Sequence, residues 1–214
     1  VLAELVAAAH ARGAKAIAVT FDPHPKAVHA PDHQPELITG IDDRIERIAQ
    51  TGVDGIVIQP YTIDFAMATP EEFVRDYIVD GLGAVAIVVG SDTRFGRGNA
   101  GDIETLRHLG QQLDVSIDIV GDAADEHPGA RRWSSTWVRE LLDQGDLRAA
   151  ADILGAPHRL RGTVIHGDKI GRQIGFPTAN LDVYAGLIPR HGVYAGWLEV
   201  VDPCDNADAA VLVG

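Results

Sequence analysis

The sequence predicts two domains of different architecture: a doubly wound, Rossmann-like parallel α/β sheet over residues 1–156, followed by part of an antiparallel β-barrel over residues 157–214. Helical stretches and short apolar strands alternate up to about residue 155. The pattern changes at "GAPHRLRG" (155–162), after which short β-like runs follow, separated by Gly, Pro and Asp. A chain of 214 residues with 46% apolar side chains is long enough to bury two cores.

Four apolar runs predict the strands of the first domain. They are "KAIAVTF" (15–21), "VDGIVIQPY" (53–61), "AVAIVVG" (84–90) and "VSIDIVG" (115–121). Each run is apolar almost throughout rather than alternating, as expected for strands that helices cover on both faces. The runs therefore favour a parallel sheet.

Helical patterns separate and follow these strands. They lie at residues 1–13, 42–52, 69–83, 102–113, 135–145 and 147–155. The clearest helix start has Thr69 as N-cap, Pro70 at the first helical position and Glu72 placed for a capping box. In the second domain we find only β-like runs, "LRGTVIHG" (160–167), "GVYAGWLEVV" (192–201) and "AAVLVG" (209–214).

The composition argues against several classes of protein and partner. The formal net charge of −13 argues against nucleic acid as the main partner, because such binding depends on basic patches. A single cysteine, Cys204, excludes a disulfide framework and suits a reducing cytoplasm. No apolar run approaches the roughly 20 residues that span a bilayer, so we expect no membrane partner. The chain starts at Val1 inside a helical pattern and stops in a strand-like run, so we expect a piece of a longer protein. Whether it forms a homo-oligomer stays open.

In an open parallel sheet, ligands gather outside the carboxyl ends of the strands, and two loops follow such ends here. The loop "FDPHP" (21–25) holds His24 between two prolines, which limit its freedom, and places Phe21 at the strand end. The loop "GSDTRFGRGNAGD" (90–102) carries Asp92 and glycines that let the backbone approach a ligand. The alternatives are a proline-rich turn with a surface histidine and a core phenylalanine, and a flexible glycine-rich connection.

The segment "RRWSSTWVREL" (131–141) combines hydroxyls with arginines at the start of a helix. Ser134 or Ser135 is expected to cap this helix, whose amide donors and dipole attract anions. The combination predicts a phosphate site. The alternative is a plain serine N-cap.

The run "GRQIGFPTANL" (171–181) carries two small oxygen-bearing side chains one residue apart. In an extended segment, Thr178 and Asn180 would point to the same face. A hydroxyl and an amide oxygen in this arrangement suit Mg²⁺ or a phosphate. The alternative is a turn in which Asn180 bonds its own backbone.

These motifs, in this order, resemble the prokaryotic bifunctional FAD synthetase family, which joins an FMN adenylyltransferase to a riboflavin kinase. The matching stretches are "TFDPHP" (20–25), "VVGSDTRFGRGNAGD" (88–102), "SSTWVRELL" (134–142), "GTVIHGDKIGRQIGFPTANL" (162–181) and "GVYAGWL" (192–198). The resemblance implies a nucleotidyltransferase-type α/β domain that adenylylates FMN and a six-stranded β-barrel that phosphorylates riboflavin. It also implies ATP as a substrate of both reactions, Mg²⁺ as the metal, and the small molecules ATP, riboflavin and FMN as partners.

The resemblance implies roles for individual residues as well. The flavin of the adenylyltransferase would lie at Phe21, His24, Pro25 and Asp92. Its ATP phosphates would lie at Ser134, Ser135, Thr136 and Arg139. In the kinase, Thr178 and Asn180 would be the catalytic residues that bind Mg²⁺ and the phosphates. The ATP loop of the kinase would consist of Gly167, Lys169, Gly171, Arg172 and Gly175.

The chain departs from the family pattern in four respects. The family's His-x-Gly-His motif, which contacts ATP phosphates, and the glutamate base of its kinase do not occur, and we expect them before Val1 and after Gly214. Thr93 stands where an aromatic residue is usual and Trp133 where an aliphatic one is usual, which bears on the shape of the flavin pocket. We therefore expect the chain to bind ligands but to turn over poorly. Two alternatives stay open: a single-activity adenylyltransferase for another phosphorylated cofactor precursor, and a flavin-binding module without catalysis.

Overall fold

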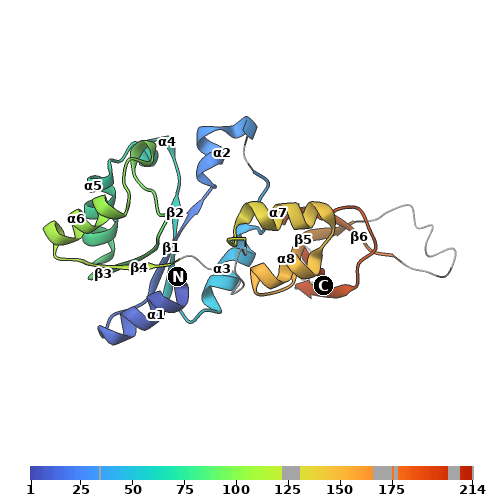
Figure 1. The fold of residues 1–214 in the computed structure, drawn as a ribbon. Helices are drawn as coiled ribbons and strands as arrows, with labels where there is room; N and C mark the ends of the chain where they lie inside the picture. Colours follow the sequence, from blue (N-terminus) through green and yellow to red (C-terminus); the bar gives the residue numbers. More distant parts are fainter. Residues whose placement is uncertain (34, 122–130, 166–174, 176–177, 202–207, 214) are drawn as a thin grey trace. The chain divides into compact units, whose positions relative to one another are not determined.

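The computed structural model describes residues 1–33, 35–121, 131–165, 175, 178–201 and 208–213, and the chain divides into two compact units (Figure 1). Unit 1 comprises Val1–Pro35 and Ile45–Ala123, and unit 2 comprises Glu36–Arg44 and Ala124–Gly214. The two last helices before residue 156 thus share a unit with the C-terminal strands. The domain boundary at 156/157 stays a prediction, and the compact units divide the chain at other positions.

Unit 1 is built on parallel strands, as predicted. The strands are β1 (Ile17–Asp22), β2 (Gly55–Pro60), β3 (Ala86–Gly90) and β4 (Ser116–Val120). β1 pairs with β2, and β3 pairs with β4, both in parallel. Within the described residues these pairs are two separate two-stranded sheets rather than the one continuous sheet that was expected. One edge of β1 and one edge of β3 therefore lack a strand partner in the described part of the chain.

Helices and turns connect these strands. They are α1 (Leu2–Ala11), α2 (Pro25–His29), η1 (Pro31–His33), α3 (Ile41–Ala49), α4 (Ile63–Ala66), α5 (Pro70–Glu72), η2 (Phe73–Asp80), η3 (Arg97–Asn99) and α6 (Ile103–Leu113). The predicted capping box is confirmed: the Thr69 hydroxyl accepts a bond from the Glu72 amide at 3.2 Å, and the Glu72 carboxylate accepts one from the Thr69 amide at 2.7 Å. η2 continues α5 as a π-helix.

The core of unit 1 lies on the β3–β4 pair. Val74 of η2 and Leu106 and Leu109 of α6 are almost fully buried. Partly buried residues of both strands, Ile87 and Ile117 among them, pack against these three side chains. Figure 1 shows α5 and α6 beside this pair of strands. The packing explains the apolar residues of β3 and the apolar positions Ile117, Ile119 and Val120 of β4.

Unit 2 contains an antiparallel sheet. Its strands are β5 (His158–Ile165), β6 (Asn180–Ala185), β7 (Gly196–Val201) and β8 (Asp208–Val213), in the order β6-β5-β8-β7. Ile165 lies opposite Asn180, and His158 lies opposite Val213. The predicted antiparallel strands are confirmed, but the described strands form an open four-stranded sheet and not a closed barrel.

One core joins the helices of unit 2 to this sheet. The helices are α7 (Ser135–Gln144) and α8 (Leu147–Leu154). The buried core residues are Val138, Leu141 and Leu142 of α7, Leu147 and Ala150 of α8, and Leu160 of β5. Gly145 ends α7 with φ 82°, a left-handed conformation that glycine adopts without a steric cost and that turns the chain into α8. Through Leu160, β5 packs in the same core as α7.

No helix in the described ranges combines the length and the apolar character needed to cross a membrane.

Candidate functional site

A cavity of about 770 Å³ lies between the two strand pairs of unit 1. Its walls are side chains of α1, β1, η2 and β3, most of them apolar. It extends from Phe21 near the end of β1 to Thr93 and Arg94, which follow β3. The two loops that were predicted to bind a ligand therefore begin at one cavity.

Phe21 belongs to an aromatic cluster, which consists of Phe21, Tyr61, Phe65, Phe73, Tyr77 and Phe95. The Phe21 ring meets Tyr61 edge to face, with 5.7 Å between the centroids, and lies 5.7 Å from Phe65. Burial raises the pKa of Tyr61, whose hydroxyl bonds to His29 Nε2 at 2.9 Å. Phe21 is half-buried, so it is partly the core phenylalanine of the alternative hypothesis, while its contact with flavin stays a prediction.

Sequence reasoning missed Tyr61 and Phe65 as neighbours of Phe21. A signal was present, because "PYTIDF" (60–65) follows the second strand as Phe21 closes the first. In the parallel register, Asp22 lies opposite Pro60, which brings Tyr61 next to the end of β1. Residues that follow adjacent parallel strands therefore lie close together at the same edge of the sheet.

His24 has a structural role in addition to the one that was predicted. It is the N-cap of α2, and its Nδ1 accepts a hydrogen bond from the Lys26 amide at 3.1 Å. The neutral ring must then carry its proton on Nε2. Pro25 occupies the first position of the helix, and the Asp22–Pro23 peptide bond is cis. His24 and Pro25 begin α2 directly after β1, and their contact with flavin stays a prediction.

Asp92 is exposed in the turn after β3. The next residue, Thr93, donates from its hydroxyl to the Gly90 carbonyl at 2.8 Å, which closes the turn. Arg94 forms an ion pair with Asp102 at 3.4 Å. The turn therefore presents Asp92 beside the loop that begins at the cavity, and the contact of Asp92 with flavin stays a prediction.

Packing explains two glycines of the loop that follows. Gly96 has φ 70°, and an added Cβ would lie 2.6 Å from the Pro70 nitrogen. An added Cβ at Gly101 would lie 2.8 Å from the Phe95 ring. These glycines allow close contact within the protein, so they give no independent support for a ligand at this loop.

In unit 2, the predicted phosphate segment begins α7. Ser134 is the N-cap, and its hydroxyl accepts a hydrogen bond from the Trp137 amide at 3.2 Å, as the plain N-cap alternative predicts. Ser135 and Thr136 are exposed in the first turn. Arg139, one turn later, is half-buried and donates from Nε to the Glu36 carbonyl at 3.1 Å. The structure thus collects these residues at one helix end, while their binding of ATP phosphates stays a prediction.

Two arginines near this helix end have different partners. Arg131 donates to both carboxylate oxygens of Glu140, at 2.5 and 2.9 Å, and lies 5.3 Å from the Trp137 ring centroid. The hydrogen bonds raise the pKa of Arg131 and lower that of Glu140. In the described part of unit 2, no carboxylate pairs with Arg139. Arg139 is therefore the better candidate for binding an external anion.

The predicted kinase residues lie where the chain enters β6. Thr178 and Asn180 are exposed, and Asn180 is the first residue of the strand. Gly175 has φ 84°, in the left-handed region that favours glycine. The other predicted loop residues, Gly167, Lys169, Gly171 and Arg172, lie outside the described residues.

The donors at this strand suit Mg²⁺ better than a transition metal. Thr178 and Asn180 offer a hydroxyl and an amide oxygen, which are hard ligands, and Mg²⁺ often takes few ligands from protein and the rest from phosphates and water. The described residues contain no group of three or more His, Cys, Asp or Glu side chains that could hold a metal on its own. The site fits an ion that arrives with a nucleotide.

Comparisons with known proteins find a match for each of the two parts of the chain. The family model described as FAD synthetase matches residues 1–136, and the one described as riboflavin kinase matches residues 154–214. A bifunctional riboflavin kinase/FMN adenylyltransferase of Listeria monocytogenes is 37% identical over 187 residues, which cover 86% of this chain and 58% of the relative. The proteins of the same name from Escherichia coli K12 and Bacillus subtilis are 34% and 35% identical, over 86% and 90% of the chain and 58% and 60% of the relatives.

A solved structure is also similar. The crystal structure described as a macrolide-efflux protein from Streptococcus pneumoniae aligns with a TM-score of 0.78 and 27% identity, over 99% of this chain and 74% of that one. The chain spans 58% of the length of the first two curated relatives.

Proposed function

The chain belongs to the FAD synthetase family, and from this premise we propose that it serves FAD biosynthesis through two activities. One is the ATP-dependent phosphorylation of riboflavin to FMN, and the other is the adenylylation of FMN to FAD with release of pyrophosphate. The observation that carries the proposal is the tandem match, with an FAD synthetase model over residues 1–136 and a riboflavin kinase model over residues 154–214. The single cysteine supports a cytoplasmic location.

In adenylyl transfer, the phosphate of FMN attacks the α-phosphorus of ATP in line, and pyrophosphate leaves. The enzyme contributes mainly by positioning the reactants and stabilising the charge on the leaving group. The amides of the first turn of α7 and the guanidinium of Arg139 are suited to that task. The half-buried ring of Phe21, at the cavity of unit 1, is suited to the flavin.

In the kinase reaction, the ribityl 5′-hydroxyl of riboflavin attacks the γ-phosphorus of ATP. Thr178 and Asn180 would hold Mg²⁺ through their side-chain oxygens, together with phosphate and water ligands. Bound Mg²⁺ neutralises charge that develops on the phosphates. Asn180 lies in the ladder opposite Ile165, which fixes its backbone and so limits where its side chain can reach.

We further propose that the cavity between β1 and β3 takes one more strand. Neighbouring strands of a sheet lie about 4.8 Å apart, so a strand between β1 and β3 would pair with both and join the two pairs into one doubly wound sheet. In unit 2, Trp197, Leu198 and Val200 of β7 are more than half exposed, which supports further strands that would close a barrel.

Titration calorimetry tests the proposed activities. Riboflavin should give binding heat only in the presence of Mg²⁺ and a non-hydrolysable ATP analogue. FMN binding that is indifferent to nucleotide would instead favour a flavin-binding module without catalysis. ATP binding with no affinity for riboflavin under any condition would favour a single-activity adenylyltransferase for another cofactor precursor.

The metal site has its own test in the full-length protein. Replacing Thr178 and Asn180 by alanine should abolish the formation of FMN from riboflavin. Asp182→Ala is the matched control, because Asp182 is exposed two residues further along β6. Unchanged FMN formation in the double variant would remove Thr178 and Asn180 from the proposed site.

A further inference from the structure

Residues 36–44, called the strap below, lie between β1 and β2 in the sequence but belong to unit 2. The chain passes from unit 1 to unit 2 after Pro35 and returns to unit 1 at Ile45, within α3. The nine residues of the strap thus interrupt the sequence of unit 1 and form part of unit 2. Its contacts explain why it stays with unit 2.

Three residues of the strap contact the rest of unit 2. Glu36 accepts the hydrogen bond from Arg139 Nε at 3.1 Å. The Ile38 carbonyl accepts one from the Leu187 amide at 3.4 Å, and the Ile38 side chain packs on the core of α7, α8 and β5. At Gly40 an added Cβ would lie 2.6 Å from the Ala185 Cβ, so the backbone runs directly against the end of β6.

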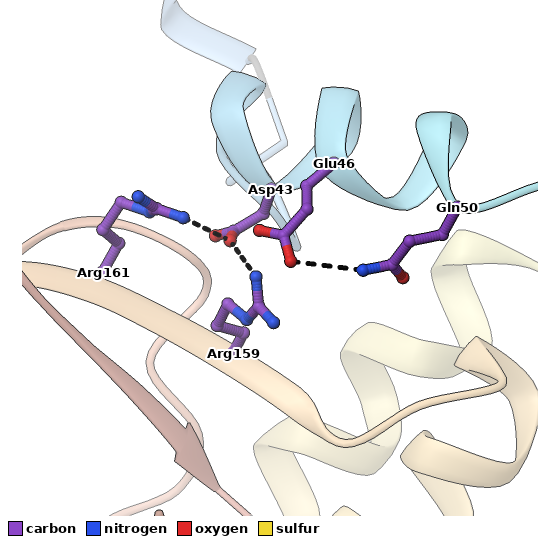
Figure 2. A network of polar contacts seen from close by, with 5 residues as sticks. All are labelled: Asp43, Glu46, Gln50, Arg159 and Arg161. Carbon is purple, nitrogen blue, oxygen red and sulfur yellow. Dashed lines mark hydrogen bonds and ion pairs between the residues drawn. The ribbon is translucent and has the colours of Figure 1, made fainter. Parts of the chain in front are cut away.

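Asp43 anchors the far end of the strap. Its side chain is 0% exposed, and its Oδ1 accepts hydrogen bonds from Arg159 Nη1 and Arg161 Nη2, each at 3.0 Å (Figure 2). Burial opposes the charge of Arg161, but the hydrogen bond and the charge of Asp43 outweigh it, and the pKa of Arg161 is raised. A buried carboxylate between two arginines is stable only while its partners stay in place, so the strap is fixed to β5.

The strap also orients the arginine that was singled out at α7. The bond from Nε to the Glu36 carbonyl fixes the plane of the Arg139 guanidinium, and among the described residues nothing occupies its two Nη groups, which can meet an anion. Ser135 lies one helical turn before Arg139, on the same side of α7. The acceptor is a backbone oxygen, so its position depends on where the strap runs and not on the side chain of Glu36.

We propose that Asp43 is a positioning residue for adenylyl transfer: it holds the strap on β5, and the strap carbonyl of Glu36 holds Arg139 in the orientation that binds the ATP phosphates. This inference rests on the function proposed above. It adds a contribution from the kinase half to the other reaction, because the arginines that hold Asp43 belong to β5. Arg139 touches the phosphates, whereas Asp43 acts only through the strap.

A double-mutant cycle tests the inference. Mg-ATP binding is measured by calorimetry in the full chain, in a Thr178→Ala, Asn180→Ala background that removes the proposed kinase site. Arg139→Lys keeps the charge but loses the Nε donor, and Asp43→Asn keeps the shape but loses the charge that holds both arginines. Each change should weaken Mg-ATP binding about tenfold, which corresponds to a charge-assisted hydrogen bond. The double variant should bind no more weakly than either single variant, because both act through one contact.

A second pair of variants moves the strap without touching a charge. Gly40→Ala should displace the strap from Ala185 and weaken Mg-ATP binding, and adding Ala185→Gly should restore it by making room for the new methyl group. Glu36→Ala is the matched control: it removes an exposed side chain, keeps the carbonyl, and should leave binding unchanged. The rescue matters because a general loss of stability would not be repaired by a second, smaller side chain.

The outcomes separate the inference from the function on which it rests. Wild-type-like Mg-ATP binding in Asp43→Asn, or a double variant that binds about a hundredfold more weakly as independent effects would give, overturns the positioning role alone. Failure of Ala185→Gly to rescue Gly40→Ala also overturns it. A chain that binds no Mg-ATP before any change at Asp43 overturns both the inference and the proposed function.

Discussion

Replacing Asp43 by alanine should destabilise unit 2 far more than the loss of one surface charge would. The carboxylate is completely buried, and the side chains of Arg159 and Arg161 are only 16% and 15% exposed. Alanine would leave two guanidinium groups facing each other with little water to solvate them. Removing one partner of a buried ion pair costs about 3–5 kcal/mol.

Tryptophan fluorescence in urea measures this cost in one unit. All three tryptophans, Trp133, Trp137 and Trp197, lie in the sequence of unit 2, so their emission reports that unit. With a denaturant slope of about 1.5 kcal/mol per molar urea, the loss corresponds to a fall of roughly 2–3 M in the midpoint. Circular dichroism should show a second component that shifts less, because most of the helices that the structure describes belong to unit 1.

A matched control and a rescue make the prediction specific. Asp42→Ala removes the same charge from the exposed neighbouring position and should cost under about 1 kcal/mol. Replacing the whole ion cluster, with Asp43→Leu, Arg159→Met and Arg161→Met, should recover most of the stability, since no buried charge is left unpaired. A midpoint for Asp43→Ala equal to that of Asp42→Ala would refute the reasoning.

Three further changes test the local structure. Hydrogen bonds from the backbone amide and the hydroxyl of Thr69 lower the pKa of Glu72. The ionised carboxylate therefore stabilises the native state above its unfolded pKa, and this stabilisation is lost as the pH falls through its folded pKa. Glu72→Gln should make the melting temperature fall less steeply with decreasing pH. Gly96→Ala adds a methyl group against Pro70 at a residue with φ 70°, and it should lower the melting temperature by several degrees in differential scanning calorimetry. Leu142→Ala empties a site that is 0% exposed and should cost about 2–5 kcal/mol in urea unfolding followed by tryptophan emission.

Much of the fold was predictable because its signals are local. The capping residues Thr69, Asp102 and Asp146 each accept a bond from the amide three residues further along, so sequence spacing alone locates these helix starts. The apolar runs predicted the parallel strands for a similar reason, since a short run of apolar residues is itself a local pattern. The positions of the strand ends in the sequence also predicted which two loops begin at the cavity of unit 1.

The parts that escaped prediction depend on contacts between distant residues. Asp43 pairs with arginines 116 and 118 residues away, and "IDDRIERIA" (41–49) gives no sign that one of its two aspartates is buried. Periodicity places both aspartates in the first turn of a helix, where exposed acidic residues are common. The pairing of the parallel strands into two separate two-stranded sheets was equally hidden, because pairing depends on contacts between distant segments and not on the pattern of each strand.

The position of β5 has a consequence for how two activities coexist in one chain. Leu160 of β5 packs with Leu141 and Leu142 of α7 in one core, so the helix proposed for one nucleotide and the strand that leads to the other cannot change their relative position without breaking that core. The strap adds a second connection between the same two elements, through Arg139 at one end and Asp43 at the other. Closely packed interiors transmit displacement because they contain little free volume. A displacement of α7 would therefore act on β5 as well, through the core that the two elements share.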